Sequence, residues 1–145
     1  HLSLRRQRQM CIRDSGYSWI DGRWRRTDQS TTSAVLGDGG IYSSLDDLAR
    51  WDAALYDDRL LSKASRRAMF SPATSTPEPD VPHYGFGWRL NGPVQWHSGE
   101  SIGFRNVIVR HPEKHLTVIV LTNRNDPEPY PLALKIAQRW LDTLQ

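Results

Sequence analysis

The sequence predicts an α+β domain in which an antiparallel sheet packs with helices. Four short segments, each apolar or alternating, follow one another between residues 84 and 122, with turn residues between them. Helix-type patterns stand before and after these segments rather than between them. Strands joined by short turns form antiparallel pairs, and helices confined to the ends of a run of strands are typical of the α+β class.

The strands are expected at about residues 84–90, 94–98, 104–110 and 116–122. The first is aromatic with a period of two, and the last two are separated by a short turn, which predicts a hairpin. The last strand is almost wholly apolar, which predicts a central strand covered on both faces. The preceding segment, 71–82, contains four prolines and is expected to be a connector without regular structure.

Helices are expected at about residues 45–56, 63–70 and 131–144. Ser44, with Asp47 three residues later, resembles a capping box, and Ser62 can cap the second helix. The third helix has apolar side chains at helical spacing, which indicates a face packed against the sheet. On the first helix, Asp52 lies on the otherwise apolar side.

Glycines mark two further segments near the N-terminus. Asp21-Gly22 suits the two-residue turn of a short hairpin at 17–24, because both positions of such a turn require a positive φ. The segment 37–40 reads Gly-Asp-Gly-Gly and predicts a loop with tight backbone conformations.

Positive charge is concentrated at the N-terminus. The formal charge is +3, yet residues 1–26 hold seven arginines and two acids, a balance of +5 that leaves −2 for the rest. Residues 1–15 look like translated sequencing-adapter sequence, and we expect them to be a non-native or disordered basic tail. Nucleic-acid binding through this arm is disfavoured, because interleaved aromatic residues and a known reader fold are missing. Residues 16–145 are then the domain to interpret.

Composition excludes several other classes. The longest apolar run, 118–121, is far too short to span a bilayer. The single cysteine, Cys11, excludes an internal disulfide framework and a cysteine-based zinc finger. His111 and His115 are four residues apart, but the spacing crosses a turn, so no metal site is expected. We likewise expect no cofactor.

The most informative segment is His97-Ser98-Gly99 at the end of a predicted strand. An imidazole there titrates near neutral pH, and a glycine lets a ligand approach the backbone closely. On the residues alone, a histidine that only completes local hydrogen bonding at the end of a strand is the favoured interpretation.

An ordered set of motifs resembles the penicillin-recognising serine hydrolases, which include class C β-lactamases, D-alanyl-D-alanine carboxypeptidases and related esterases. The segment GDGGIYSSLDDLARW at 37–51 is similar to one of theirs. It is followed in the family's order by Tyr-Gly-x-Gly-Trp at 84–88, His-x-Gly at 97–99, a hairpin ending in Leu-Thr-Asn and a last helix. The resemblance covers about residues 30–145 and only the C-terminal part of the family's domain.

The resemblance implies roles for four residues. The family's third motif, Lys-Thr-Gly or His-x-Gly, lies on the strand beside the active site. His97 is then expected to place a donor or positive charge near the substrate carboxylate and the catalytic base. Ser98 would bind substrate, Gly99 would let the acyl group lie against the strand, and the backbone N–H of Glu100 would be one oxyanion donor.

The departures from the family pattern limit this interpretation. No serine is followed by lysine at the third position, and no tyrosine or serine is followed by asparagine at the second. The nucleophile and its base are therefore absent. We expect a piece of a hydrolase acting on β-lactam, D-alanyl peptide or ester substrates, inactive alone. The alternative is a non-enzymatic binding or structural remnant of the fold.

Gly99-Glu-Ser-Ile-Gly103 also matches G-x-S-x-G, the nucleophile elbow of α/β-hydrolases. That elbow requires a strand, a sharp turn and then a helix. Here a strand is predicted from residue 104, which disfavours the elbow.

The partner expected for the parent protein is a small acyl substrate. Strands and helices missing from a partial domain would leave an open sheet edge, so we also expect self-association. The resembled family is often extracytoplasmic or periplasmic, but the sequence itself assigns no compartment.

Overall fold

The computed structural model describes residues 15–28 and 41–143. The chain forms two compact units. One comprises residues up to 43 with 99–106 and 121–129, and the other comprises 44–98, 107–120 and the chain from 130 onward. Residues 1–14 of the expected basic tail and the Gly-rich loop at 37–40 lie outside the described residues.

The first unit contains a two-stranded hairpin of β1 (Tyr17–Ile20) and β2 (Arg23–Arg26). Asp21 and Gly22 have φ values of 50° and 74°, as the sequence predicts for this turn. Trp19 lies opposite Trp24, and their rings meet edge to face with centroids 5.1 Å apart. Cross-strand aromatic pairs of this kind stabilise a hairpin.

A six-stranded sheet has the order β3-β4-β5-β6-β7-β8, so every strand lies beside its sequence neighbour. Short turns suffice for such a meander, which agrees with the predicted α+β class. The strands are β3 (Thr74–Ser75), β4 (His83–Tyr84), β5 (Arg89–Asn91), β6 (Val94–Ser101), β7 (Phe104–His111) and β8 (Leu116–Thr122).

The strand predicted at 84–90 is in fact two short strands. β4 and β5 pair antiparallel with Tyr84 opposite Arg89. Between them the Gly85 N–H donates to the Trp88 carbonyl at 2.8 Å, and Gly87 has a φ of 77°. The glycines turn the chain inside an aromatic pattern that by itself suggests one strand. The connector at 71–82 also holds a strand, β3, of only two residues.

The strand β8 was predicted to be central, and this is wrong for the part of the chain that the structure describes. It stands at the end of the sheet order, beside β7. Both of its faces are nevertheless in contact with other elements. Val118 and Val120 pack against one buried cluster, and the Thr117 hydroxyl donates to Asp52 at 2.9 Å.

Three helices occur where they were predicted, with ends shifted by one or two residues: α2 (Leu45–Ala54), α3 (Lys63–Met69) and α4 (Tyr130–Asp142). The Ser44 hydroxyl accepts from the Asp47 N–H at 3.2 Å, and the Ser62 hydroxyl accepts from the Ser65 N–H at 3.2 Å. Each serine thus satisfies an N–H that the first helical turn leaves without a partner.

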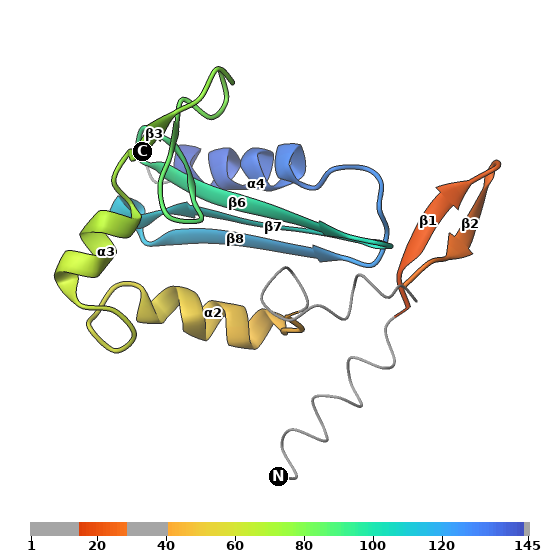
Figure 1. Ribbon diagram of the computed structural model, residues 1–145, viewed down its shortest axis with the longest axis horizontal. Coiled ribbons are helices and arrows are strands. Elements are labelled where there is room, and N and C mark those ends of the chain that lie inside the picture. The colour runs from red at the N-terminus through yellow and green to blue at the C-terminus, as the bar shows by residue number, and fades with distance from the viewer. Residues whose placement is uncertain (1–14, 29–40, 144–145) are drawn as a thin grey trace, which may run out of the picture. The chain divides into compact units, whose positions relative to one another are not determined.

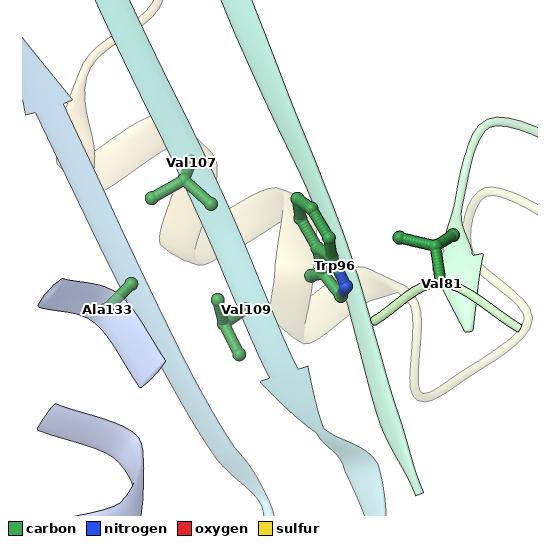
Figure 2. Close-up of a cluster of buried hydrophobic side chains, with 5 residues drawn as sticks. All are labelled: Val81, Trp96, Val107, Val109 and Ala133. Atoms are coloured by element: carbon green, nitrogen blue, oxygen red, sulfur yellow. The ribbon is translucent and has the colours of Figure 1, made fainter. Parts of the chain in front are cut away.

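Two buried clusters lie on opposite faces of the sheet. Figure 2 shows the first, in which residues of β6 and β7 pack with one residue of helix α4 and one of the connector before β4: Val81, Trp96, Val107, Val109 and Ala133. The second contains Leu55, Trp88 and Leu90, with Ile108 beside them. On β7, successive side chains therefore alternate between the clusters. Figure 1 shows α4 along one face of β6, β7 and β8 and α2 along the other.

No helix within the described residues combines the length and apolar character needed to cross a membrane.

Candidate functional site

His97 lies half-buried in the middle of β6. Its Nε2 atom and the Tyr84 hydroxyl are 3.1 Å apart and share a hydrogen bond. The two rings meet edge to face, with centroids 6.3 Å apart. This contact from β4 fixes the orientation of the imidazole.

Burial lowers the pKa of His97, and the positive charge of Arg89 lowers this pKa further. A hydrogen bond with the Ser98 backbone acts in the opposite direction. Loss of hydration disfavours the charged form of a histidine, and so does a neighbouring cation. His97 is therefore a neutral imidazole at neutral pH, able to donate or accept a proton but carrying no fixed charge.

Ser98 is held by Arg89 of β5. The Arg89 guanidinium donates to the Ser98 hydroxyl at 2.8 Å and lies over the Trp96 ring, 4.5 Å from its centroid. Trp96 stands directly opposite Arg89 in the antiparallel pair. Residues two apart in a strand share a face, so Trp96 and Ser98 both present their side chains to Arg89. The Ser98 hydroxyl can still donate its own proton.

Gly99 and Glu100 continue the same strand. A Cβ added at Gly99 would meet no atom within 4 Å among the described residues, so packing does not require glycine there. The Glu100 carboxylate pairs with Arg105 at 2.9 Å, and Arg105 pairs also with Glu128 at 2.7 Å. The side chain of Glu100 is thus engaged in an ion-pair network separate from its backbone N–H.

Ser101 does not form a nucleophile elbow. It is the last residue of β6, and Gly103, with a φ of 80°, turns the chain directly into β7. A strand follows where the elbow requires a helix. The prediction against the elbow is confirmed.

The histidine pair at the β7–β8 turn is separated by a short 3-10 turn, Pro112–Lys114. His115 has a φ of 48° and stacks on Tyr56 with centroids 4.7 Å apart. Within residues 15–28 and 41–143, no three His, Cys, Asp or Glu side chains lie together as metal ligands would.

Two comparisons with known proteins bear on the family of this chain. A sequence model of the Beta-lactamase family matches residues 1–139. The chain belongs to the beta-lactamase family. Penicillin-binding protein 4* of Bacillus subtilis (strain 168) is 36% identical over 113 residues, which is 74% of this chain. The beta-lactamase-family chain described here spans 25% of the length of that relative.

Sequence reasoning missed the residues of this beta-lactamase-family chain that orient His97 and Ser98. Arg89 was interpreted only as a member of one aromatic strand, and Tyr84 as a member of that strand and of the Tyr-Gly-x-Gly-Trp motif, without a role at the site. A signal was present in the two glycines at 85 and 87, since a turn there brings the strand's two halves side by side. Once the hairpin forms, β5 lies next to β6 and both side chains reach the motif.

Proposed function

We propose that this chain is the C-terminal part of a serine hydrolase that acts on β-lactam, D-alanyl peptide or ester substrates through an acyl-enzyme. Membership of the beta-lactamase family supports the reaction class. The observation that supports roles for particular residues is the motif His97-Ser98-Gly99 on β6. Its imidazole is oriented by a hydrogen bond with Tyr84.

His97 would act beside the catalytic base and the substrate carboxylate. Its lowered pKa favours the neutral form, which can share a proton without repelling a neighbouring cationic group. Ser98 would offer its hydroxyl proton to the substrate while Arg89 holds its oxygen. Arg89 adds positive charge close to where a substrate carboxylate would lie.

Gly99 and Glu100 would serve the acyl group through the backbone. The space around the Gly99 Cα would let an acyl chain lie against the strand. The Glu100 N–H would be one of two oxyanion donors, and such a donor typically stabilises the transition state by about 3 kcal/mol. The second donor would be the N–H of the nucleophile itself.

The chain alone would hydrolyse nothing. Its sequence contains neither Ser-x-x-Lys nor Tyr-x-Asn or Ser-x-Asn, so the nucleophile and its activating base would come from elsewhere in a longer protein. The span of one quarter of the relative's length supports this interpretation. Residues 1–15 would be a tail foreign to the domain, and 16–145 its C-terminal portion.

The first test is the open reading frame upstream of residue 16 in the source DNA. A frame that encodes Ser-x-x-Lys and then Tyr-x-Asn is the expected result. The extended protein should then release chromophore from nitrocefin or a p-nitrophenyl ester, whereas the purified chain should not. A start codon at residue 16 with no such frame would favour a binding or structural role.

A pair of histidine variants assigns the activity to the motif. In the extended protein, His97→Gln should lower kcat/KM at least tenfold. His83→Gln is the matched control, because His83 is exposed on β4. Equal activity in the two variants would contradict the role of His97.

We also propose that the separate chain associates with itself. The outer edge of β8 pairs with no further strand among the described residues. On α4, three apolar side chains spaced four residues apart form an exposed stripe: Leu132, Ile136 and Trp140. Unpaired strand edges and exposed apolar faces both favour association with another copy.

A further inference from the structure

A cavity lies in the larger unit, away from the His97 motif. It is an open cleft of about 330 Å³ between the end of α2, the helix α3 and the strands β6 and β7. None of Tyr84, Arg89, His97 and Ser98 lines it. Its chemistry can therefore be considered apart from the proposed hydrolase function.

The lining of this cleft is strongly cationic. Four basic side chains and no carboxylate line it: Lys63, Arg66, Arg67 and Arg110. Two of these positive charges are neutralised by carboxylates. Arg66 pairs with Asp58 at 2.6 Å, and Arg110 pairs with Asp52. Lys63 and Arg67 have no ion pair within residues 15–28 and 41–143. The cleft therefore presents two unmatched positive charges.

The charges of Lys63 and Arg67 can reach the same part of the cleft. Lys63 and Arg67 are four residues apart on α3, so they lie on the same side of the helix with Cβ atoms about 6 Å apart. Both side chains are exposed and free to turn into the cleft. A single group carrying two negative charges would neutralise both of them.

A buried hydroxyl on the cleft wall has no partner. The Tyr56 side chain lines the cleft, and its Oη atom is buried without a hydrogen bond to any described residue. Buried polar groups in folded proteins nearly always have a protein or solvent partner. Because this oxygen has no surface open to the cleft, a ligand oxygen can pair with it only if the Tyr56 ring turns toward the cleft.

The remaining wall is apolar. It is formed by Leu55, Phe70 and Pro112. The Arg110 guanidinium lies over the rings of Tyr56 and Phe70, with its Cζ atom 5.0 and 5.3 Å from their centroids. Apolar surface beside a few converging polar groups is the usual composition of a small-molecule site. The ligand would then combine a doubly charged group with a hydrocarbon or aromatic portion.

We propose that this cleft binds an organic phosphate monoester. The phosphate dianion would lie between Lys63 and Arg67, and its organic group would lie against Phe70 and Pro112. The Tyr56 hydroxyl would join the site by a turn of its ring toward the phosphate. Arginine and lysine are the side chains that most often bind phosphate, the former through paired N–H donors. A phosphate monoester places both negative charges on one group, whereas a dicarboxylate separates them.

The experiment is a titration of the folded chain with phenyl phosphate at low ionic strength, followed by calorimetry and by tryptophan near-UV signals that report the fold. Saturable binding of one molecule per chain is expected. Inorganic phosphate should bind more weakly, because it lacks the organic group, and benzyl alcohol should not bind. Tighter binding of succinate than of phenyl phosphate would overturn the assignment to a phosphate monoester, as would no saturation by phenyl phosphate.

Variants locate the site. Lys63→Gln and Arg67→Gln should each weaken binding about tenfold, the usual effect of losing one charge-assisted hydrogen bond. Tyr56→Phe should weaken binding severalfold while leaving the charge unchanged. Lys135→Gln and Arg139→Gln on α4 are the matched controls, because both residues are exposed and distant in sequence from the cleft. Equal losses in the control variants would mean nonspecific attraction and would overturn the proposal.

Discussion

Arg110 of β7 and Asp52 of α2 form an ion pair in the interior of the larger unit, with only 1% of Arg110 exposed. Thr117 donates to the second carboxylate oxygen of Asp52 at 2.9 Å, and Arg110 donates to Gln95 at 3.0 Å. The Arg110 guanidinium also lies over the rings of Tyr56, Phe70 and Trp88. The pair joins α2 to the sheet through both charges and hydrogen bonds.

Replacing Asp52 by alanine should destabilise the fold by about 3–5 kcal/mol, because it leaves the buried Arg110 charge without a partner. Urea unfolding followed by tryptophan fluorescence measures the change. Asp46→Ala is the control, since Asp46 lies exposed on the same helix and should cost less than about 1 kcal/mol. The double replacement Asp52→Leu with Arg110→Met should recover most of the loss. A single-variant effect as small as that of the control would contradict a buried pair.

Stability should depend on pH through His97. Its pKa is lower in the folded chain than the value of about 6.5 in an unfolded one. The unfolded chain therefore binds more protons between those two pKa values, and stability falls as pH drops through that window. Above pH 6.5 the contribution is fully present, and below the folded pKa it is lost. Unfolding curves at several pH values check this, and His97→Gln should remove this part of the dependence.

Replacing Arg89 tests one cause of the lowered pKa of His97. Because its charge lowers the pKa of His97, Arg89→Gln should raise that pKa toward 6.5. The imidazole proton shifts in an NMR titration report the value for each histidine. His83, which is exposed on β4, serves as an internal reference. An unchanged His97 pKa in the variant would leave burial as the sole cause.

Local features of the fold could be predicted from the sequence. The turn at Asp21-Gly22 and the caps Ser44 and Ser62 depend on residues within a few positions of each other, and all three formed as predicted. Their hydrogen-bond and φ requirements involve only neighbouring residues and no distant contact. The final helix formed as predicted from its apolar spacing, but the face predicted to pack on the sheet is buried only in part. Ala133 and Ala137 are buried, whereas Ile136 and Trp140, which belong to the same predicted stripe, are exposed.

Long-range pairings could not be predicted in the same way. Asp52 stood out as an acid on the apolar side of its helix, but its partner is 58 residues away and depends on which face of β7 meets α2. The contact of Tyr84 with His97 depends on the turn at 85–88, which an aromatic period of two conceals. The position of β8 at the sheet edge depends on which strands pair with it, and the sequence of β8 does not specify this. Its apolar side chains indicate only that both of its faces are covered.

Association of the chain should depend on the apolar stripe of α4. Ile136 and Trp140 are 45% and 59% exposed on this helix. Ile136→Glu should shift the sedimentation profile toward monomer, because a charge there opposes burial against another copy. Gln138→Glu adds the same charge to another exposed position of α4 and should change the profile little. A monodisperse monomer in the unmodified chain, with a sharp melting transition, would rule out self-association.

Two glycines on the sheet should respond differently to alanine. At Gly85 an added Cβ would collide with the Met69 carbonyl oxygen, and backbone cannot move aside cheaply, so Gly85→Ala should cost about 1–3 kcal/mol of stability. At Gly99 an added Cβ meets open space, so Gly99→Ala should change stability by less than about 0.5 kcal/mol. Thermal melts of both variants measure these effects.

In the extended hydrolase the order should reverse for catalysis. There Gly99→Ala should lower kcat/KM for p-nitrophenyl esters, because the methyl group would occupy the place proposed for the acyl chain. If Gly99→Ala left kcat/KM unchanged in a stable enzyme, the substrate would not lie against this strand.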